Sequence, residues 1–409
     1  MTPGLPIAVL TAAVAAASVS GETITVCAKG CDFTSINAAI AAASDGDAIQ
    51  LRAETYSEGV VIDTQGRRIS IVGVVDRNGA PRTILDGGDG HGIFRCIRGE
   101  DEETIFENLV IRNGSAPAGA GMYNEGSSPA LTNCTFTGNS TPTGGGGMSN
   151  RSSSPTLVGC IFEGNSAVTA GAMSNFNQSS PVLIGCVFRD NTAGVAGAMS
   201  NILSCSPTMI GCSFNGNSSD DFCGVMFNLD QCNPVLTGCT FEDNSADGSG
   251  GVMVNSEDSN PLLTDCTFAR NSGTRGGGIY NFQSSPVLNG CEFIENSATY
   301  GGGMFSDLSS SPTLTGTIVC GNAPDQIAGT WIDDCGNCVR STCENCLPAS
   351  ETCPSDLVRD CYTDIGDLET FLLRWGACHL DACSGDFNHD GVVDGADLGI
   401  LLAAWGPCD

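Results

Sequence analysis

The residues best suited to chemistry lie near the C-terminus, in a short segment rich in oxygen donors. Counting from Asp386, side-chain oxygens fall at positions 1, 3, 5, 9 and 12, and a backbone carbonyl falls at position 7. Gly391 occupies position 6, where a calcium loop turns sharply. This spacing predicts a Ca²⁺ site, and the alternative is an acidic turn without a metal. The ligands would be Asp386, Asn388, Asp390, Val392, Asp394 and Asp397.

A second copy of this segment begins 30 residues upstream. Val358 replaces the oxygen donor at position 3 and Cys361 replaces the glycine, and both changes weaken the case for calcium there. Each copy leads into a helical stripe of apolar residues that ends in Trp-Gly. The acidic positions of the second copy are Asp356, Asp360, Asp364 and Asp367.

The two loop–helix units together resemble a type I dockerin over Cys353–Asp409. Position 12 is Asp397, as in dockerins, where an EF-hand would carry glutamate. The resemblance implies a small α-helical module that holds calcium and docks onto a cohesin-like or other cell-surface partner. Dockerins usually select partners through polar residues at positions 10 and 11, which here are Gly395 and Ala396. We therefore expect a calcium-stabilised anchoring module, with cohesin as one option.

Elsewhere no nucleophile–base pair stands out, so we assign no catalytic residue. Gly90-His91-Gly92 resembles a short polygalacturonase motif. The Asn-Thr-Asp that normally precedes this motif and the Arg-Ile-Lys that follows it are absent, so we predict a structural role for His91. The other two histidines, His379 and His389, lie in the C-terminal module.

Aromatic residues follow a column of methionines that recurs along the middle of the chain. A side chain next to an inward-facing methionine points outward from a strand, so these aromatics could form a face on which sugars stack. Packing beneath loops explains them equally well. The residues are Tyr123, Phe227, Tyr280 and Phe305.

A repeat of 25–27 residues must position these side chains, and it is marked by seven cysteines. Each cysteine is followed two residues later by phenylalanine, which places both side chains on the inner face of one strand. Three short strands per unit fit a parallel β-helix better than a propeller blade. Asparagines at equivalent positions would then stack and hydrogen-bond along the rod. The cysteines are Cys134, Cys160, Cys186, Cys212, Cys239, Cys266 and Cys291.

The repeat motif GGGM-x-N…SSP-x-L-x-x-C-x-F-x-x-N-S resembles the bacterial right-handed parallel β-helix family with polymorphic-outer-membrane-protein-like repeats. It covers roughly Gly119–Asn322. The resemblance implies an all-β rod, for which we expect 10 to 12 coils. The apolar stripe of Phe33–Ser44 predicts a helix that caps the open N-terminal end. The scaffold leaves activity open, because unrelated functions share it.

The cysteines outside these strands predict disulfides. Cys27 and Cys31 bracket a tight loop and are predicted to form a bridge. The doubled CxxC within 335–346 favours disulfides over zinc, because its central gap is shorter than in zinc ribbons. For the repeated cysteines we predict core packing, with a metal or redox column as the alternative. Turns of adjacent coils are predicted to bring together Cys205, Cys223 and Cys232.

The net charge of −30 would repel nucleic-acid phosphate and anionic lipid, so neither is expected as a partner. The N-terminal apolar run resembles a secretory signal and is too short to span a membrane. Together with 23 cysteines it predicts export, without a transmembrane segment. The expected domains are a signal peptide (1–21), the β-helix (22–332), a Cys-rich linker (333–352) and the dockerin-like module (353–409).

Three functions fit these patterns. The first is a secreted or cell-surface β-helix that binds carbohydrate or a surface without catalysis. The second is a polysaccharide lyase or glycoside hydrolase, which would need a cluster of acidic and basic side chains on one face. The third is an adhesin or structural rod. Very even repeats favour the first over the second, because catalytic sites usually require loop insertions that break the period.

Overall fold

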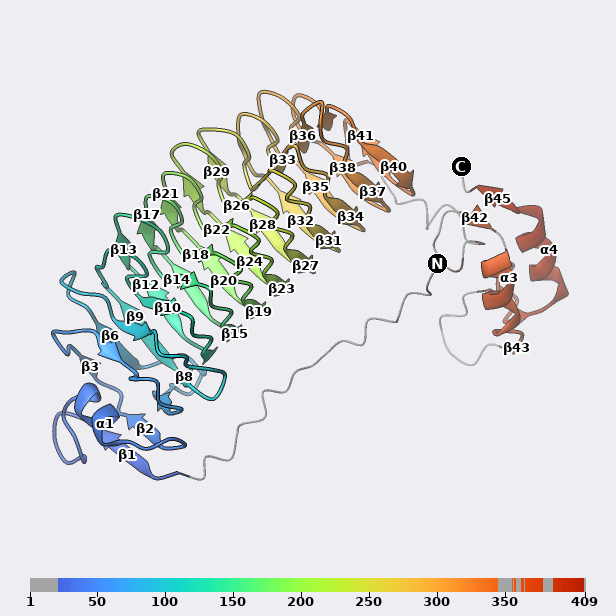
Figure 1. The fold of residues 1–409 in the computed structure, drawn as a ribbon. Coiled ribbons are helices and arrows are strands. Elements are labelled where there is room, and N and C mark those ends of the chain that lie inside the picture. Colours follow the sequence, from blue (N-terminus) through green and yellow to red (C-terminus); the bar gives the residue numbers. More distant parts are fainter. Residues whose placement is uncertain are drawn as a thin grey trace.

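The computed structural model describes residues 21–344, 355, 357, 362–363, 365–377 and 385–407. Between residues 21 and 344 the chain winds into a curved rod, and each coil contributes short strands to three long sheets (Figure 1). Strands of successive coils pair in parallel. The long sheets contain 13, 12 and 11 strands, so the predicted parallel β-helix is confirmed, at the upper end of the expected coil number.

The thirteen-stranded sheet contains β1 (Thr23–Val26), β2 (Ala48–Leu51), β5 (Ser70–Val72), β8 (Ile105–Glu107), β11 (Ala130–Thr132), β15 (Thr156–Val158), β19 (Val182–Ile184), β23 (Thr208–Ile210), β27 (Val235–Thr237), β31 (Leu262–Thr264), β34 (Val287–Asn289), β37 (Thr313–Thr315) and β40 (Ile332–Cys335). The twelve-stranded sheet contains β3 (Thr55–Tyr56), β6 (Thr83–Asp86), β9 (Leu109–Arg112), β12 (Thr135–Thr137), β16 (Ile161–Glu163), β20 (Val187–Arg189), β24 (Ser213–Asn215), β28 (Thr240–Glu242), β32 (Thr267–Ala269), β35 (Glu292–Ile294), β38 (Ile318–Cys320) and β41 (Cys338–Arg340).

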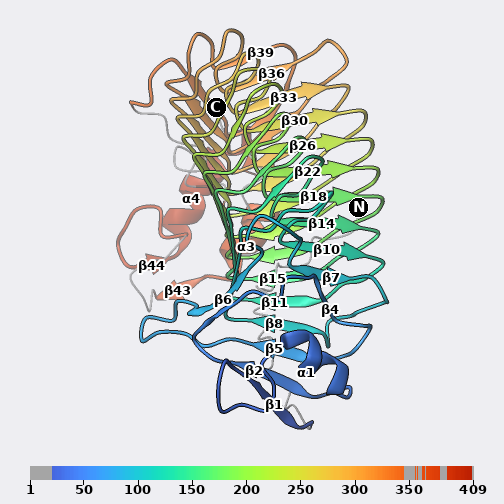
Figure 2. The same cartoon turned by 90° about the vertical axis from the view of Figure 1, so that its left-hand side faces the viewer.

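The eleven-stranded sheet contains β4 (Ile62–Asp63), β7 (Phe94–Cys96), β10 (Met122–Glu125), β14 (Met148–Arg151), β18 (Met173–Phe176), β22 (Met199–Ile202), β26 (Met226–Leu229), β30 (Met253–Ser256), β33 (Ile279–Phe282), β36 (Met304–Ser306) and β39 (Ile327–Ala328). Figure 2 shows these strands as one row of successive rungs. A short fourth sheet contains β13 (Ser140–Thr141), β17 (Ser166–Ala167), β21 (Thr192–Ala193), β25 (Ser218–Ser219) and β29 (Ser245–Ala246).

The predicted capping helix is present as α1 (Ile36–Ala42), at the N-terminal end of the stack (Figure 2). Its N-cap is Ser35, whose hydroxyl accepts a hydrogen bond from the backbone N–H of Ala38 (3.2 Å). Ile36 and Ile40 are fully buried, so the apolar stripe covers the open end of the core.

The interior is built from columns of identical side chains, because the strands pair in register. Phe136 pairs with Phe162 and so on along the rod, with neighbouring ring centroids 4.5–4.9 Å apart. At most 1% of the surface is exposed for each phenylalanine, methionine and repeat cysteine of these columns; the seven repeat cysteines are called the ladder cysteines below. The predicted core role of the repeated cysteines therefore agrees with their burial, and each of the seven is a free thiol.

Two columns of buried asparagines run the length of the repeats. In the inner asparagine ladder, each side-chain N–H donates to the amide oxygen of the next coil, beginning with Asn124 to Asn150 (2.8 Å). In the turn asparagine ladder, each amide oxygen accepts both the backbone N–H and the side-chain N–H of the coil before, as Asn165 does from Asn139 (3.1 and 3.0 Å). Apart from Asn124 Oδ1 at the start of the inner ladder, these bonds pair side-chain groups that would be costly to bury unpaired.

The β-helix continues past residue 332, where its C-terminal boundary was expected. β40 and β41 pair with β37 and β38, so residues 333–340 belong to the β-helix rather than to a linker. A disulfide joins Cys320 on β38 to Cys343, and Cys338 is also disulfide-bonded. The predicted preference for disulfides agrees with these two bonds, while residues 345–352 lie outside the described part of the chain.

The off-ladder cysteines correct one prediction and confirm another. Cys27 and Cys31 form the expected disulfide. Cys205 and Cys232 stack on equivalent turns of two successive coils, where the Cys205 N–H donates to the Cys232 sulfur (3.1 Å). Cys223 does not join them. It pairs with Ala196 in a column that precedes the strands of the eleven-stranded sheet, whereas Cys205 and Cys232 follow those strands.

The described C-terminal segment contains two helices, α3 (Ile365–Leu372) and α4 (Gly395–Ala403). Two antiparallel pairs accompany them, β42 (Tyr362–Thr363) with β45 (Gly406–Pro407) and β43 (Gly376–Ala377) with β44 (Val392–Val393). Phe371, Val393 and Leu401 form a separate small core. Residues 1–20 of the predicted signal peptide and most acidic positions of the second loop copy lie outside the described residues. None of the described helices has the length and apolar character that a membrane span requires.

Candidate functional site

The outer face of the eleven-stranded sheet changes character along the rod. Methionine and asparagine side chains point inward, so the residue between them points outward on every strand. The in-register pairing lines these residues up in one outward column. From β4 to β36 the column reads Asp63, Arg95, Tyr123, Ser149, Ser174, Ser200, Phe227, Val254, Tyr280 and Phe305.

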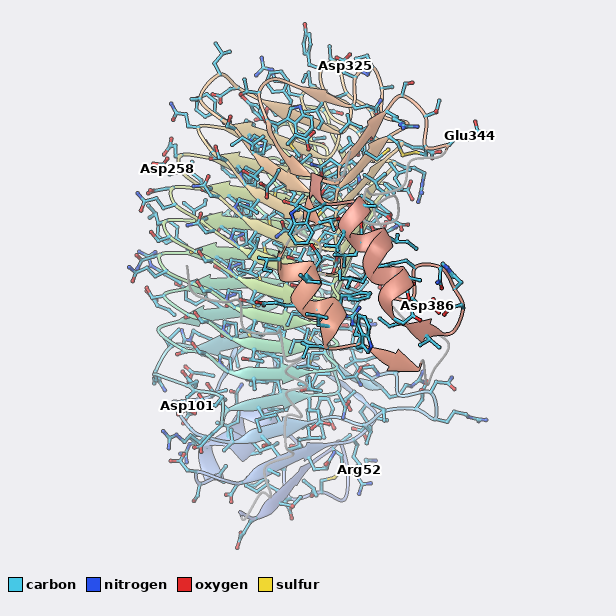
Figure 3. The ribbon with its side chains drawn as sticks, turned by 90° about the vertical axis from the view of Figure 1, so that its right-hand side faces the viewer. Arg52, Asp101, Asp258, Asp325, Glu344 and Asp386 are labelled. Atoms are coloured by element: carbon cyan, nitrogen blue, oxygen red, sulfur yellow. A yellow bond between two sulfur atoms is a disulfide. The ribbon has the colours of Figure 1, made fainter. Side chains whose placement is uncertain are left out.

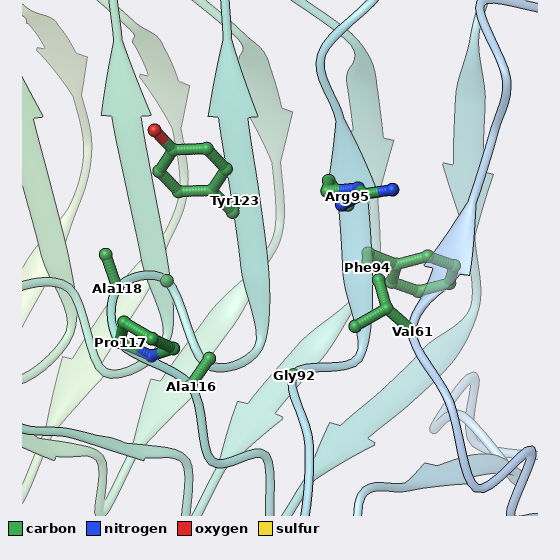
Figure 4. A pocket seen from close by; sticks show the side chains of 9 residues that line it. Val61, Gly92, Phe94, Arg95, Ala116, Pro117, Ala118 and Tyr123 are labelled. Atoms are coloured by element: carbon green, nitrogen blue, oxygen red, sulfur yellow. The ribbon is translucent and has the colours of Figure 1, made fainter.

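Two adjoining cavities lie over the N-terminal part of this column. The first encloses about 330 Å³ beside β7 and β10, with Arg95 and Tyr123 on neighbouring strands (Figure 4). Its opposite wall is the loop 116–119, which presents Ala116, Pro117 and Ala118. This cavity is therefore largely apolar, with an aromatic ring at one end.

The second cavity encloses about 320 Å³ and continues over β14 and β18. It shares Ala118 and Tyr123 with the first, so the two form one groove along the rod. Its lining adds hydroxyl groups, one guanidinium and two apolar side chains. The added residues are Thr143, Gly144, Ser149, Arg151, Thr169, Ser174, Phe176 and Ile202. Small-molecule sites typically enclose roughly 300–1,000 Å³, and the two cavities together fall within that range.

Polar contacts fix the aromatic ring at the centre of this groove. The Tyr123 hydroxyl donates to Glu125 Oε2 (3.2 Å), and Glu125 Oε1 lies 3.7 Å from Arg151 Nε. The Arg151 guanidinium in turn lies over the Phe176 ring, 5.4 Å from its centroid. Four side chains from three neighbouring strands thus hold one another in place, which preorganises the groove wall.

The charged groups at the N-terminal end of the groove are paired. Asp63 Oδ2 lies 2.6 Å from Arg95 and 3.4 Å from Arg98. Partial burial opposes ionisation of Asp63, but hydrogen bonds from Arg95 and the Gln65 N–H, with the nearby positive charges, outweigh it and lower the pKa of Asp63. Burial, followed by the charge of Glu125, raises the pKa of Tyr123. Both shifts move these groups away from neutral pH, where an acid–base catalyst works best.

Beyond β18 the outward column no longer forms a groove floor. Its next residue is buried, and bulky side chains follow. Ser200 is fully buried, and Phe227 packs edge-to-face against Phe222 with centroids 5.1 Å apart. Tyr280 is only 8% exposed and lies 5.5 Å from Phe305, centroid to centroid. The four predicted stacking aromatics therefore do not form one face. Tyr123 lies in the groove, and the other three pack in a cluster, as the loop-packing alternative expected.

The histidines add no acid–base pair to the groove. His91 is half-buried, and its Nδ1 lies 2.8 Å from the Gly92 carbonyl oxygen, next to the first cavity. His389 Nδ1 lies 3.3 Å from the Phe387 carbonyl oxygen in the C-terminal loop. His379 lies outside the described residues. The geometry of His91 agrees with the structural role predicted for it.

In the predicted calcium loop, which Asp386 marks in Figure 3, backbone N–H groups donate hydrogen bonds to the carboxylates. Asp397 is fully buried, and its two oxygens accept hydrogen bonds from the backbone N–H groups of Phe387 (2.8 Å), Asn388 (3.1 Å) and Asp394 (3.0 Å). Asp386 accepts from the Gly391 N–H (2.8 Å). The Gly391 φ of 88° lies in the left-handed region, which explains the glycine there.

The donors of this loop are all oxygens, which fits a hard cation such as Ca²⁺. Three acidic, histidine or cysteine side chains do not converge at any point in the described residues, so carboxylates alone form no metal cluster here. The Asn388 amide and the Val392 carbonyl would have to complete the shell. The donor chemistry therefore fits calcium, provided that the loop closes around the ion.

Sequence reasoning missed Arg95, Arg151, Ser149 and Ser174 as groove residues. The outward column contained the available signal, since its side chains change from aromatic to small hydroxyl after Tyr123 and back to aromatic at Phe227. A run of small residues between large ones on an outer sheet face indicates a hollow.

The fold and its columns define a right-handed parallel β-helix protein. The family model for the right handed beta helix region matches residues 28–229 and 222–347, and the chain belongs to this family. No curated protein matches the chain.

Among solved structures, the chain is similar to the pectate lyase Pel9A, with 15% identity, a TM-score of 0.40, and coverage of 77% of this chain and 79% of that one. It is also similar to a mannuronic acid specific polysaccharide family 6 lyase from human gut microbiota. That match has 10% identity, a TM-score of 0.35, and coverage of 80% and 84%.

Proposed function

We propose that this protein is an exported β-helix that binds carbohydrate in the groove over β7–β18 without cleaving it. The observation that carries the proposal is the Tyr123 ring, held by Glu125 between an apolar wall and a wall rich in hydroxyls. Sugars present both a C–H face and hydroxyl edges, and they bind where an aromatic ring and hydrogen-bonding groups lie together.

The ionisable groups around the groove support binding without cleavage. Asp63 is held as a carboxylate by two arginines, and the pKa of Tyr123, raised by burial, lies further still from neutral pH. Neither group is poised to give or take a proton near pH 7. Lysine and histidine are missing from the described residues that line the groove.

A second candidate function is polysaccharide cleavage by a lyase or a glycoside hydrolase. The observation in its favour is that an arginine lines each cavity, Arg95 in the first and Arg151 in the second. Each arginine is ion-paired, which reduces its use as a catalytic group. An adhesin or structural rod without glycan binding is the third candidate.

We further propose that the C-terminal segment binds Ca²⁺ and anchors the protein to a cohesin-like or other cell-surface partner. The oxygen donors from Asp386 to Asp397 support calcium, and the two exposed tryptophans, Trp375 and Trp405, offer an apolar contact surface. Two disulfides within the β-helix, Cys27–Cys31 and Cys320–Cys343, support export, because such bonds persist in oxidising compartments.

A glycan array tests the binding proposal. The full-length protein should bind at least one polysaccharide in the presence of calcium, and Tyr123→Ala should abolish that binding. Tyr300→Ala is the matched control, because Tyr300 is 54% exposed but lies outside the groove. Unsaturated or reducing products released from any bound glycan would replace the binding-only function with the enzymatic one.

A further inference from the structure

We infer that the groove takes a neutral, unbranched glycan that runs parallel to the axis of the rod, with about one sugar for each coil. This inference rests on the proposed carbohydrate function and adds the class of glycan, its direction and its length. It follows from three features of the groove, namely the spacing of its hydroxyl groups, the pairing of its charges and the positions of its two ends.

The floor of the groove repeats at the spacing of the coils. Tyr123, Ser149 and Ser174 are partners on three successive in-register strands. Stacked rings in the core place neighbouring coils 4.5–4.9 Å apart, close to the length of one sugar in an extended chain. A glycan along the axis would therefore meet an equivalent group at each step, whereas a chain across the sheet would meet unrelated groups.

The two serine hydroxyls remain free to bind a ligand. Ser149 makes no side-chain hydrogen bond within the described part of the chain, and Ser174 accepts one from the buried Ser200 (3.2 Å). The Ser174 proton can thus donate outward. Both serines are half-buried on the cavity floor, where a ligand hydroxyl would replace water without loss of hydrogen bonds.

The charges favour a neutral ligand over a uronate chain. Arg95 and Arg151 lie beside Asp63 and Glu125, so the cations of the groove are balanced by carboxylates from neighbouring strands. A polyanion would have to break these pairs while approaching a protein whose net charge is −30. A neutral sugar can instead stack its C–H face on Tyr123 and leave both ion pairs intact.

The two ends of the groove limit the length of the bound segment. The floor of the groove spans four rungs, β7, β10, β14 and β18, and a fifth, β22, contributes only the Ile202 side chain at the far end. Past β18, the next outward residue, Ser200, is fully buried, so a further sugar would find no floor at this depth. We therefore expect three to four sugars to occupy the groove.

Calorimetry with oligosaccharides of two to six residues tests these statements. The probes are cello-, xylo- and manno-oligosaccharides, with oligogalacturonates of the same lengths as the charged set. We expect one neutral series to bind, with affinity that rises to three or four residues and then stays constant. Ser149→Ala and Ser174→Ala should each weaken binding by about three- to tenfold, the value of one hydrogen bond. Thr264→Val, which removes a hydroxyl from the outer face of another sheet, should change nothing.

The outcomes separate this inference from the function on which it rests. Tighter binding of oligogalacturonates, lost in Arg151→Gln, would overturn the neutral class but leave carbohydrate binding standing. Affinity that still rises at six residues, or serine variants that bind as the native protein does, would overturn the direction and length. Failure of every glycan on the array and in the calorimeter would overturn both.

Discussion

Gln326 ends the turn asparagine ladder by taking the place of the next asparagine. Its Oε1 accepts the backbone N–H and the side-chain N–H of Asn322 (3.0 and 2.9 Å), the same two donors that each asparagine oxygen accepts elsewhere in the ladder. Its Nε2 also donates to the Asn322 carbonyl (2.9 Å). A ladder of identical bonds would otherwise leave two donors unpaired at its C-terminal end.

Replacing Gln326 with methionine should lower the free energy of unfolding by about 1–3 kcal/mol, because it strands buried donors of Asn322. Chemical denaturation measures the change, and hydrogen exchange should place it in the last coils. Gln326→Glu, which keeps the acceptor, is the matched control and should cost less. Equal effects of the two variants would contradict the capping role.

Phe188→Ala should destabilise the β-helix by about 3–5 kcal/mol, because the ring is fully buried and stacks between Phe162 and Phe214. In a solenoid the damage should concentrate in adjacent coils, where hydrogen exchange will quicken. Phe282→Ala removes a ring that is 39% exposed and should change stability by no more than about 0.5 kcal/mol.

The ladder thiols should resist modification in the native protein. Contact with the Cys186 thiol, together with burial, raises the pKa of Cys212 to about 12, so little thiolate exists at neutral pH. Peptide mapping after treatment with iodoacetamide at pH 8 should find Cys212 and its ladder neighbours unlabelled until denaturant is added. Rapid labelling of the folded protein would show that the column is accessible.

Acid should remove the stabilising contribution of Asp63. The pKa of Asp63 in the folded protein is lowered below its ordinary value of 3.8. A carboxylate with a lowered folded pKa stabilises the fold above its unfolded pKa, and this contribution is lost as the pH falls through the folded value. The melting temperature of Asp63→Asn should therefore lie below that of the native protein at pH 7, and the difference should vanish at pH values well under 3.8.

Calcium should stabilise the C-terminal segment if Asp386–Asp397 forms the proposed site. Adding Ca²⁺ to chelator-treated protein should raise the unfolding temperature reported by tryptophan fluorescence, because binding stabilises only the folded loop. Asp386→Ala should abolish the shift, whereas Glu369→Ala, an exposed charge on α3, should leave it unchanged. A native protein that shows no calcium effect would refute the site.

The repeat made the interior predictable because parallel in-register strands require equivalent residues to stack. Met122 pairs with Met148 and Phe136 with Phe162, as the sequence period indicated. The offset from the methionine column also separates the cysteines. Cys205 and Cys232 follow it by six residues, whereas Cys223 precedes it by three and occupies a different column.

The groove was harder to predict, because its walls come from positions that do not repeat. Arg151 occupies a position that is Glu125 on one neighbouring strand and Phe176 on the other, and the next two coils have Ile202 and Leu229 there. Outward residues are not constrained by the core, so their pattern carries no period. The small residues after Tyr123 indicate a hollow, but only the structure shows which side chains form its walls.

The disulfide between Cys320 and Cys343 decides how the rod would respond to tension. If the C-terminal segment is tethered, a pull on it reaches Cys343 first and passes through the covalent bridge to Cys320 on β38. This bridge offers the load a path that bypasses β40 and β41, which lie between the two cysteines. Under oxidising conditions the last coil is mechanically shielded, and reduction would allow it to peel away before any other.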